Sequence, residues 1–317
     1  MRIALTQAPP VFLNLEATVD RAGNLVREAS DGRADLVVFP ETWLPGYPVW
    51  LDEAPGAALW DHGPAKALFR HLRSQCPRLD GPEVHRLKEI AASTGCFIVM
   101  GLHEKDAGTI YNSLLFISPR GAQVLHRKLV PTYTERLLWG RGDGSGLVTL
   151  ETEWGPVGGL VCWEHWMPLA RAAMHATGEY LHVAQWPWVK EMHQVASRQY
   201  AFEGRCFVAA SGCVMSRGEV LEGAASAGAP AAAIALLESI PGDDQRLLLR
   251  GGGAVIGPDG GYLAGPQMED ARMMMVDLDD AMIEEQRMTL DSDGHYSRPD
   301  VFTLHVNRAR QRNVEDS

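Results

Sequence analysis

Cysteine is scarce in this chain and long apolar runs are absent, and each shortage excludes a class of protein. The 317 residues include five cysteines, an odd number, and no Cys-x-x-Cys pair. This usage is typical of a reducing compartment and excludes a disulfide framework. No apolar run reaches the ~18 residues that a membrane span needs, and residues 1–7 are too short and polar for a signal peptide. We therefore expect a cytoplasmic protein without a membrane partner.

Positive charge is also in short supply. The chain has 29 Lys and Arg against 40 Asp and Glu, a formal net charge of −11. Such a balance argues against nucleic acid as a partner. No Gly-x-Gly-x-x-Gly follows a first strand, which argues against a dinucleotide-binding oxidoreductase. No His-Glu-x-x-His is present, which argues against a zinc site of that type. The glycine-rich segment 142–146 lacks the lysine of a phosphate loop, so we interpret it as a flexible loop.

Strand-like and helix-like segments alternate along most of the chain, which indicates an α/β protein. Two stretches, 45–82 and 218–237, break the alternation, and we interpret them as loops at the rim of the active site or at subunit contacts, with surface insertions as the alternative. A single domain is expected over 1–307, followed by a frayed polar tail over 308–317. The expected strands are 3–7, 96–102 and 206–210, the expected helices 15–29, 83–94 and 191–205, and a hairpin covers 255–262. Alternation alone would suggest a doubly wound parallel sheet.

Cys162 ends a short, glycine-rich apolar run and is followed by a helical pattern that begins near Pro168. The run is typical of a buried strand, so the thiol lies at a strand-to-helix elbow. Free N–H groups at a helix start favour the thiolate, which is the nucleophilic form. The alternative is a small buried apolar residue, as most free cysteines are.

Glu41 follows a strand-like run of apolar residues that stops at Pro40. A carboxylate at a strand end beside Phe39 and Trp43 is partly desolvated, which raises its pKa toward neutrality and suits it to proton transfer. The alternative is a surface glutamate that begins a loop.

Lys128 is one of only five lysines in the chain and is followed by Leu129, Val130 and Pro131. An ammonium in these half-apolar surroundings is able to stabilise negative charge on a substrate atom. Taken alone, an ordinary solvated cation is the better interpretation.

The three segments together resemble one family. Phe-Pro-Glu-Thr-Trp around Glu41, His-Arg-Lys-Leu-Val-Pro-Thr around Lys128 and Gly-Leu-Val-Cys-Trp-Glu around Cys162 look like the Glu-Lys-Cys triad of the nitrilase superfamily, the carbon–nitrogen hydrolases. The order and spacing also fit, and the resemblance runs from the first strand to about residue 307. Local motifs at 134–144 and 294–300 resemble the true nitrilase branch.

The resemblance implies a fold, further site residues and an assembly. The implied fold is a four-layer α-β-β-α sandwich, and the implied assembly is a homo-oligomer, either a dimer or a longer spiral. Glu135 is then a second active-site carboxylate that binds the lysine and orients the substrate. Aromatic side chains near the motifs are expected to bind the substrate: Tyr47, Trp163, Trp186 and Trp188.

The implied activity is hydrolysis of a small-molecule nitrile to a carboxylic acid through a cysteine thioimidate and thioester, with no metal or organic cofactor. Two alternatives from the same superfamily remain open at this point, an amidase and an enzyme acting on cyanide or a dinitrile. A catalytically silent scaffold of the same fold is the alternative outside the enzymes. The sequence does not identify the nitrile.

Overall fold

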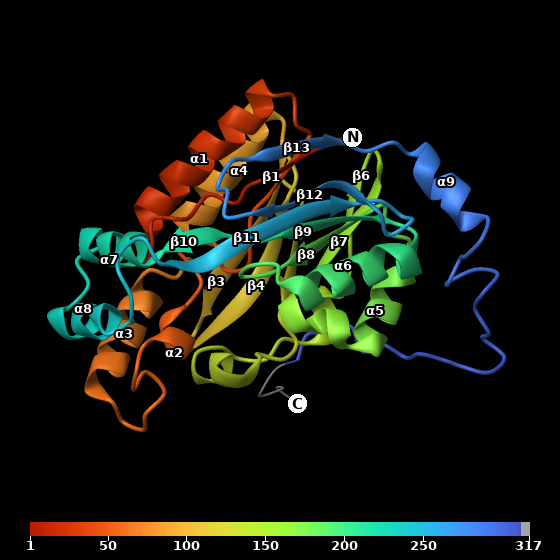
Figure 1. Ribbon diagram of the computed structural model, residues 1–317. Helices are drawn as coiled ribbons and strands as arrows, with labels where there is room; N and C mark the ends of the chain where they lie inside the picture. Colours follow the sequence, from red (N-terminus) through yellow and green to blue (C-terminus); the bar gives the residue numbers. More distant parts are fainter. Residues whose placement is uncertain (312–317) are drawn as a thin grey trace.

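The computed structural model describes residues 1–311 and arranges them as two stacked β-sheets between layers of helices (Figure 1). The first sheet has six strands in the order β13-β1-β2-β3-β4-β5. Their bounds are β1 (Arg2–Leu5), β2 (Leu36–Val38), β3 (Phe97–Asp106), β4 (Thr109–Ile117), β5 (Gln123–Arg127) and β13 (Met274–Asp277).

The second sheet has seven strands in the order β10-β11-β9-β8-β7-β6, with β12 paired to β11. Each sheet has a parallel centre, β1-β2-β3 in the first and β7-β8-β9 in the second, and antiparallel strands complete it. The bounds are β6 (Leu150–Thr152), β7 (Gly155–Val161), β8 (Leu181–Gln185), β9 (Phe207–Ser211), β10 (Val214–Ser216), β11 (Leu247–Ile256) and β12 (Tyr262–Met268).

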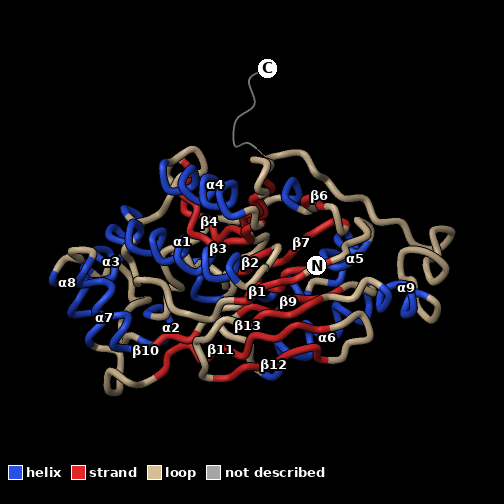
Figure 2. The backbone as a smooth tube through the Cα atoms, turned by 90° about the horizontal axis from the view of Figure 1, so that it is seen from above, coloured by secondary structure: helices blue, strands red, loops and turns tan. Residues whose placement is uncertain are grey.

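Helices cover the outer faces of both sheets, with α1 and α4 on one flank of the strands and α5 and α6 on the other (Figure 2). The helix bounds are α1 (Leu15–Asp31), α2 (Trp50–Glu53), α3 (Gly63–Ser74), α4 (Pro82–Thr94), α5 (Pro168–His175), α6 (Glu191–Gly204), α7 (Arg217–Ser226), α8 (Ala231–Glu238) and α9 (Ala281–Arg287). None of the helices in the described part is long and apolar enough to cross a membrane.

Strand periodicity explains the layering. Val37 of β2 packs with the apolar stripes of α1 and α4, whereas Leu36 and Val38 on the opposite face pack toward the second sheet. Successive side chains of a strand point to opposite faces, so a strand that is buried on both faces reads as a continuous apolar run. The α-β-β-α sandwich is confirmed, and the doubly wound sheet suggested by alternation is wrong. Alternation gives the order of the elements but not the sheet that each strand joins.

Both stretches that we interpreted as loops contain helices. Segment 45–82 forms α2 and α3, and segment 218–237 forms most of α7 and α8, which contact each other, and α8 also contacts α3. Helix α7 begins with a capping box, in which Ser216 Oγ accepts from the Glu219 N–H while the Ser216 N–H donates to the Glu219 carboxylate. This Ser-x-x-Glu signal and the high helix propensity of alanine were present in the sequence.

Two segments that we expected to be mobile make specific contacts. Segment 142–146 is packed, because Gly146 is buried and Asp143 caps a short 3₁₀ turn through the Ser145 N–H, at 3.0 Å. At the C-terminus, the Arg308 guanidinium donates to the Leu147 carbonyl, so this first part of the expected tail lies against the surface. The rest of the expected tail, 312–317, lies outside the described residues.

Candidate active site

Three strand ends meet at the seam between the two sheets. Glu41 lies just past β2, Lys128 directly follows β5, and Cys162 directly follows β7. The first two belong to one sheet and the third to the other. The two sheets are joined across the seam, where the Gln185 side-chain amide donates to the Phe39 carbonyl at 2.7 Å. Side chains at the carboxyl ends of parallel strands share one edge, which is where open α/β sheets bind ligands.

The Lys128 ammonium lies between two carboxylates. Its Nζ donates to Glu41 Oε1 at 3.0 Å and to Glu135 Oε2 at 2.7 Å, and all three side chains are buried. The Asn112 amide also donates to Glu41 Oε1, at 2.7 Å. The second oxygen, Glu41 Oε2, is buried and has no hydrogen-bond partner in the described structure. One oxygen of this carboxyl is therefore fixed, and the other is free to accept a proton.

Burial raises the pKa of Glu41 to about 7, with the Lys128 charge acting in the opposite direction. For Lys128 itself, burial alone would lower the pKa, but the negative charges of Cys162, Glu41 and Glu135 outweigh it and raise the pKa well above its usual value. The ammonium is thus held charged while Glu41 is able to exchange a proton near neutral pH.

Glu135 is fixed from two further sides. Its Oε2 accepts from the Thr132 N–H at 2.6 Å, and its Oε1 accepts from the Tyr47 hydroxyl at 3.0 Å. Both contacts turn the carboxylate inward from the 3₁₀ turn η1 (Tyr133–Leu137) toward the ammonium. The structure brings Glu135 to the place where the resemblance put it.

Cys162 occupies a strained elbow. Its φ of 57° lies in the left-handed region, which residues other than glycine rarely adopt. The buried Glu164 carboxylate accepts from the Val161 N–H at 2.6 Å, from the Leu129 N–H at 2.7 Å and from His126 Nε2 at 2.9 Å. These contacts tie the elbow to the segment that carries Lys128. Strain at such a position is kept only where its surroundings enforce it.

The expected activation of the thiol by a helix start is wrong. Burial and the neighbouring Glu41 raise the pKa of the Cys162 thiol well above its usual value, although Lys128 and the Trp163 N–H favour the thiolate. The chain enters a 3₁₀ turn, η3 (Cys162–Trp166), before α5 begins at Pro168, so no α-helix N-terminus faces the sulfur. The thiol therefore keeps its proton until a base removes it.

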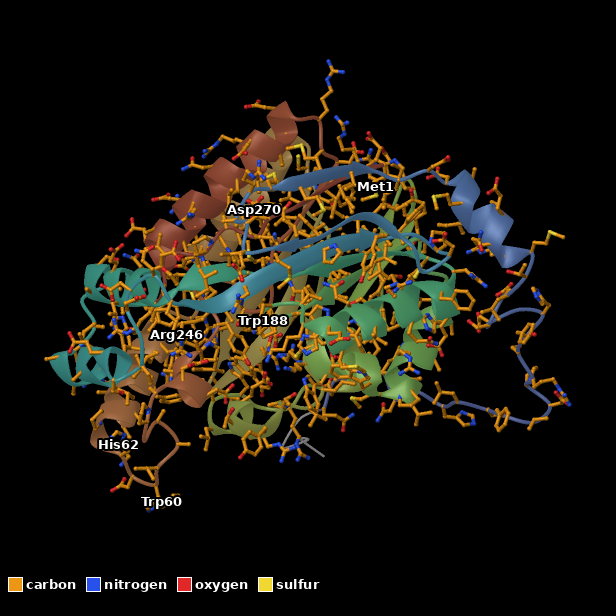
Figure 3. The ribbon with its side chains drawn as sticks, in the orientation of Figure 1. Met1, Trp60, His62, Trp188, Arg246 and Asp270 are labelled. Carbon is orange, nitrogen blue, oxygen red and sulfur yellow. The ribbon has the colours of Figure 1, made fainter. Side chains whose placement is uncertain are left out.

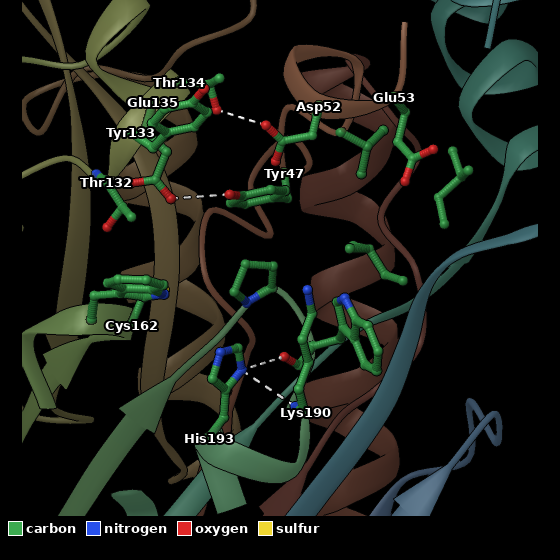
Figure 4. A pocket seen from close by; sticks show the side chains of 16 residues that line it. Tyr47, Asp52, Glu53, Thr132, Tyr133, Thr134, Glu135, Cys162, Lys190 and His193 are labelled. Carbon is green, nitrogen blue, oxygen red and sulfur yellow. Dashed lines mark hydrogen bonds between the residues drawn. The ribbon is translucent and has the colours of Figure 1, made fainter. Parts of the chain in front are cut away.

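A cavity of about 400 Å³ opens onto Cys162 and Glu135, and Glu41 and Lys128 lie behind them, outside its lining (Figure 4). Figure 4 shows Tyr47 and Glu135 on one side, Cys162 on another, and Lys190 and His193 across from them. Leu248 and Leu249 from β11 complete an apolar wall. A small organic molecule in this cavity would touch the sulfur with one end and apolar side chains with the other.

Of the four expected aromatic binding residues, three line the cavity: Tyr47, Trp163 and Trp188. Trp163 is 55% exposed and lies at the mouth. Trp186 is a correction, because its side chain is fully buried and stacks on His193, with ring centroids 4.2 Å apart. Past the end of β8 the chain turns, so that Trp186 points into the layer under α6 while Trp188 points into the cavity.

Two other findings concern residues that were not predicted to bind the substrate or to act in catalysis. Trp60, from the long segment, is 98% exposed and projects from the outer tip between α2 and α3, whereas Trp188 lies near the middle of the molecule (Figure 3). Asn112, which contacts Glu41, was missed, although a polar residue inside the apolar strand β4 was a usable signal.

A metal ion does not suit this cluster. Single ligand atoms of Glu41, Glu135 and Cys162 lie within 4.8 Å of one another. The Lys128 ammonium already donates to both carboxylates, so a cation in the same place would face a fixed positive charge. The donor set is better suited to covalent and proton-transfer chemistry.

Residues 2–288 match the carbon–nitrogen hydrolase family. The chain therefore belongs to the carbon–nitrogen hydrolases, as the motifs predicted.

Named relatives and solved structures agree with this assignment. The chain is 37% identical to a nitrilase of Pseudomonas syringae, with 97% of this chain and 90% of that protein covered. It is 36% identical to an aliphatic nitrilase of Sinorhizobium fredii, with 96% and 95% covered. A carbon–nitrogen hydrolase superfamily protein of Xanthomonas campestris shares the fold with a TM-score of 0.66 at 20% identity, over 96% of this chain and 99% of that one.

Proposed function

We propose that this protein is a nitrilase, which hydrolyses an organic nitrile to the carboxylic acid and ammonia. The observation that carries the proposal is the buried cluster itself. Single ligand atoms of Cys162, Glu41 and Glu135 lie within 4.8 Å of one another, one Glu41 oxygen has no partner in the described structure, and the Lys128 ammonium donates to both carboxylates. The names of the relatives, at 36–37% identity over nearly the whole chain, support the same reaction.

In the first half-reaction, Glu41 Oε2 takes the thiol proton as the sulfur adds to the nitrile carbon. The proton passes to the nitrile nitrogen, which gives a thioimidate with no net loss of atoms. The Lys128 ammonium has three N–H donors and uses two of them on carboxylates. The third N–H and the Trp163 N–H stabilise the charge that develops on the substrate.

In the second half-reaction, Glu41 activates a water that adds to the thioimidate carbon. The tetrahedral product expels ammonia, which leaves a thioester, and a second water then releases the acid and restores the thiol. If the tetrahedral product expels the sulfur instead, the amide is released. No step requires a metal or an organic cofactor.

The direct test is Cys162→Ala. We expect a folded protein without nitrile turnover, checked by circular dichroism and by ammonia release. In the native enzyme, mass spectrometry after mixing with substrate should find a covalent adduct on Cys162. A folded variant that retains turnover would remove Cys162 from the mechanism, and a native protein that forms no adduct and turns over no substrate would favour the silent scaffold.

An amidase with the same triad is the main competitor, because the thioester half is shared. A panel of aliphatic nitriles, aromatic nitriles, arylacetonitriles, dinitriles and cyanide, each organic nitrile assayed beside its amide, separates the two. We expect ammonia and acid from nitriles. Turnover of amides alone would assign an amidase, and turnover confined to cyanide or dinitriles would assign that narrower activity.

We also propose a homo-oligomer, a dimer or a longer spiral, as the family resemblance implies. Large apolar side chains are exposed on α5 and α6: Leu169, Met192, Val195 and Phe202. Exposed apolar patches of this kind typically mark subunit contacts. Light scattering on the purified protein tests this, and a monomer at micromolar concentration would contradict it.

A further inference from the structure

A buried polar chain runs from the backbone of the nucleophile to a glutamate that the reaction scheme does not use. The Cys162 carbonyl accepts from His165 Nδ1 at 2.7 Å, and His165 Nε2 lies 3.0 Å from His182 Nε2. His182 Nδ1 lies 2.8 Å from Glu179 Oε1, and the Tyr200 hydroxyl donates to Glu179 Oε2 at 2.6 Å. All of these side chains are buried.

The hydrogens in this chain can be counted. The three links Glu179–His182, His182–His165 and His165–Cys162 require three hydrogens, because a carbonyl accepts only and each link needs one donor. Two neutral imidazoles supply two hydrogens. The third must come from a protonated Glu179 carboxyl or, equivalently, from a doubly protonated His182. An ionised Glu179 beside two neutral histidines leaves one link with two facing lone pairs.

The surroundings favour the form that carries the extra proton. Burial raises the pKa of Glu179 to about 7, while it lowers the pKa of His165 to about 3 and that of His182 well below its usual value. The carboxyl lies over Gly158 of β7, where any side chain would collide with it. Other titratable and charged groups face this chain from α5, α6, the start of β9, η3 and β5: His175, Arg171, Glu203, Cys206, Glu164 and His126.

We propose that Glu179 and His182 are positioning residues, whose shared proton completes the hydrogen bonds that hold the Cys162 carbonyl and thereby the strained elbow. The proposal rests on the assignment of Cys162 as nucleophile. When the proton leaves, one of two contacts fails. Either His165 Nε2 no longer accepts a hydrogen bond from His182, or His165 Nδ1 turns a lone pair toward the Cys162 carbonyl. The elbow then relaxes from its φ of 57°, and the sulfur moves away from Glu41. Activity therefore falls on the alkaline side of about pH 7.

Glu179→Gln is the sharp test, because a glutamine amide donates to His182 and its oxygen accepts from Tyr200 without a proton to lose. We expect the wild-type kcat/KM to fall up to tenfold per pH unit between about pH 7 and about pH 9, as for loss of one proton. Glu179→Gln should retain most activity at pH 7 and lack this fall. Glu179→Ala should lose activity at every pH, because the buried His182 Nδ1 is left without a partner. It should also lack the alkaline fall, because two neutral imidazoles supply the two links that remain.

Glu203→Gln is the matched control. Glu203 lies beside the chain and pairs with Arg171 at 2.8 Å but takes no part in it, so the control should keep the wild-type alkaline limb. A folded Glu179→Gln variant whose alkaline limb is unchanged, or which is inactive at pH 7, would overturn the proposal.

Two further measurements keep the inference independent of the folding of the variants and of the proposed function. In Glu41→Gln, where the other near-neutral buried carboxyl is removed, infrared spectroscopy should detect a protonated carboxyl or a protonated imidazole that loses its proton near pH 7; the absence of both bands would overturn the proposal. Iodoacetamide labelling of Cys162 reports the elbow without any nitrile. A pH dependence of labelling that differs between the wild type and Glu179→Gln supports the chain even if no nitrile is hydrolysed, and identical profiles refute it.

Discussion

Two buried glutamates act on Cys162, Glu41 beside its sulfur and Glu179 through the hydrogen bonds to its carbonyl, and burial raises the pKa of each to about 7. Glu41 lies beside the Lys128 ammonium and keeps one oxygen without a partner. Glu179 has no lysine or arginine within ion-pair distance in the described structure, and both of its oxygens are hydrogen-bonded. Burial raises the pKa of both carboxyls, but Glu41 has a nearby ammonium and a free oxygen, whereas Glu179 has neither among the described residues.

This difference separates two uses of a titrating carboxyl. A carboxyl with a free oxygen near a thiol transfers protons during the reaction. A carboxyl with both oxygens bonded transfers nothing to the substrate and instead fixes the state of its neighbours. The pKa alone does not distinguish these roles; the count of occupied oxygens does.

Glu41→Gln tests proton transfer by Glu41 and should cause the largest fall in kcat/KM among these variants. Glutamine occupies the same volume but cannot accept the thiol proton, so kcat/KM should fall about 100-fold or more. Steady-state ammonia release at pH 7, set beside Glu179→Gln, measures the contrast. Equal losses in the two variants would mean that the free oxygen of Glu41 has no special role.

Lys128→Met removes the ammonium that lies beside Glu41 and, within residues 1–311, has no counterpart beside Glu179. Turnover should fall about 100-fold or more, because charge on the substrate loses its partner. The free energy of unfolding should also fall, by about 3–5 kcal/mol, because two buried carboxyls lose their counterion. Urea denaturation measures this. Lys66→Met is the control, since Lys66 and its partner Asp61 are both exposed and such pairs contribute about 0–1 kcal/mol. An equal loss in both variants would contradict a special role for the buried pair.

The acid side of the pH profile sharpens the comparison further. The pKa of Glu41 is raised, so the base form is lost as pH falls through about 7. Below that point kcat/KM should fall up to tenfold per pH unit. Together with the alkaline limb assigned to Glu179, this gives a bell-shaped profile.

Asn112→Leu tests the assignment of the acid limb. The Asn112 amide stabilises the Glu41 carboxylate and lowers its pKa. Its removal raises that pKa, so the acid limb should move to higher pH while the alkaline limb stays in place. If both limbs move together, the acid and alkaline limbs are not controlled by two separate groups.

The sequence predicted Glu41, Lys128 and Cys162 because each follows a recognisable strand end within a distinctive motif. It did not predict Asn112 or Glu179. Asn112 meets the site only through the register of β4 against the segment after β5, where the Lys128 N–H donates to the Asn112 carbonyl at 2.8 Å. Glu179 meets Tyr200 only once α6 packs against the second sheet. A polar residue inside β4 signals a buried polar contact, but the partner in such a contact depends on packing between elements and cannot be read locally.

The fold shows the same division. Individual helices and strands were predictable from periodicity, including the ends of α1 and α4 at Asn14 and Gly95. Their arrangement in two sheets came from family resemblance. Alternation by itself gave the wrong architecture, since hairpins such as β3-β4 and helical crossovers such as β1-α1-β2 occur in the same sheet. Trp186 and Trp188 were indistinguishable in sequence because the turn after β8 decides which one faces the cavity.

The smallest expected effects come from two tyrosines, one for each side of the comparison. Tyr47 donates to Glu135 at 3.0 Å and Tyr200 donates to Glu179 at 2.6 Å. Tyr47→Phe removes a donor that helps fix Glu135, one of the two carboxylates that bind Lys128. We expect kcat/KM to fall about tenfold, as for loss of a hydrogen bond to a charged group. Tyr200→Phe should cost less than about threefold at pH 7, because the Tyr200 hydrogen bond lowers the pKa of Glu179 and the bond-completing proton binds more tightly without it. For the same reason the alkaline limb of Tyr200→Phe should move to higher pH, whereas that of Tyr47→Phe should not move. A Tyr200→Phe profile shifted to lower pH would show that the active chain carries an ionised Glu179, and the comparison between the two glutamates would then fail.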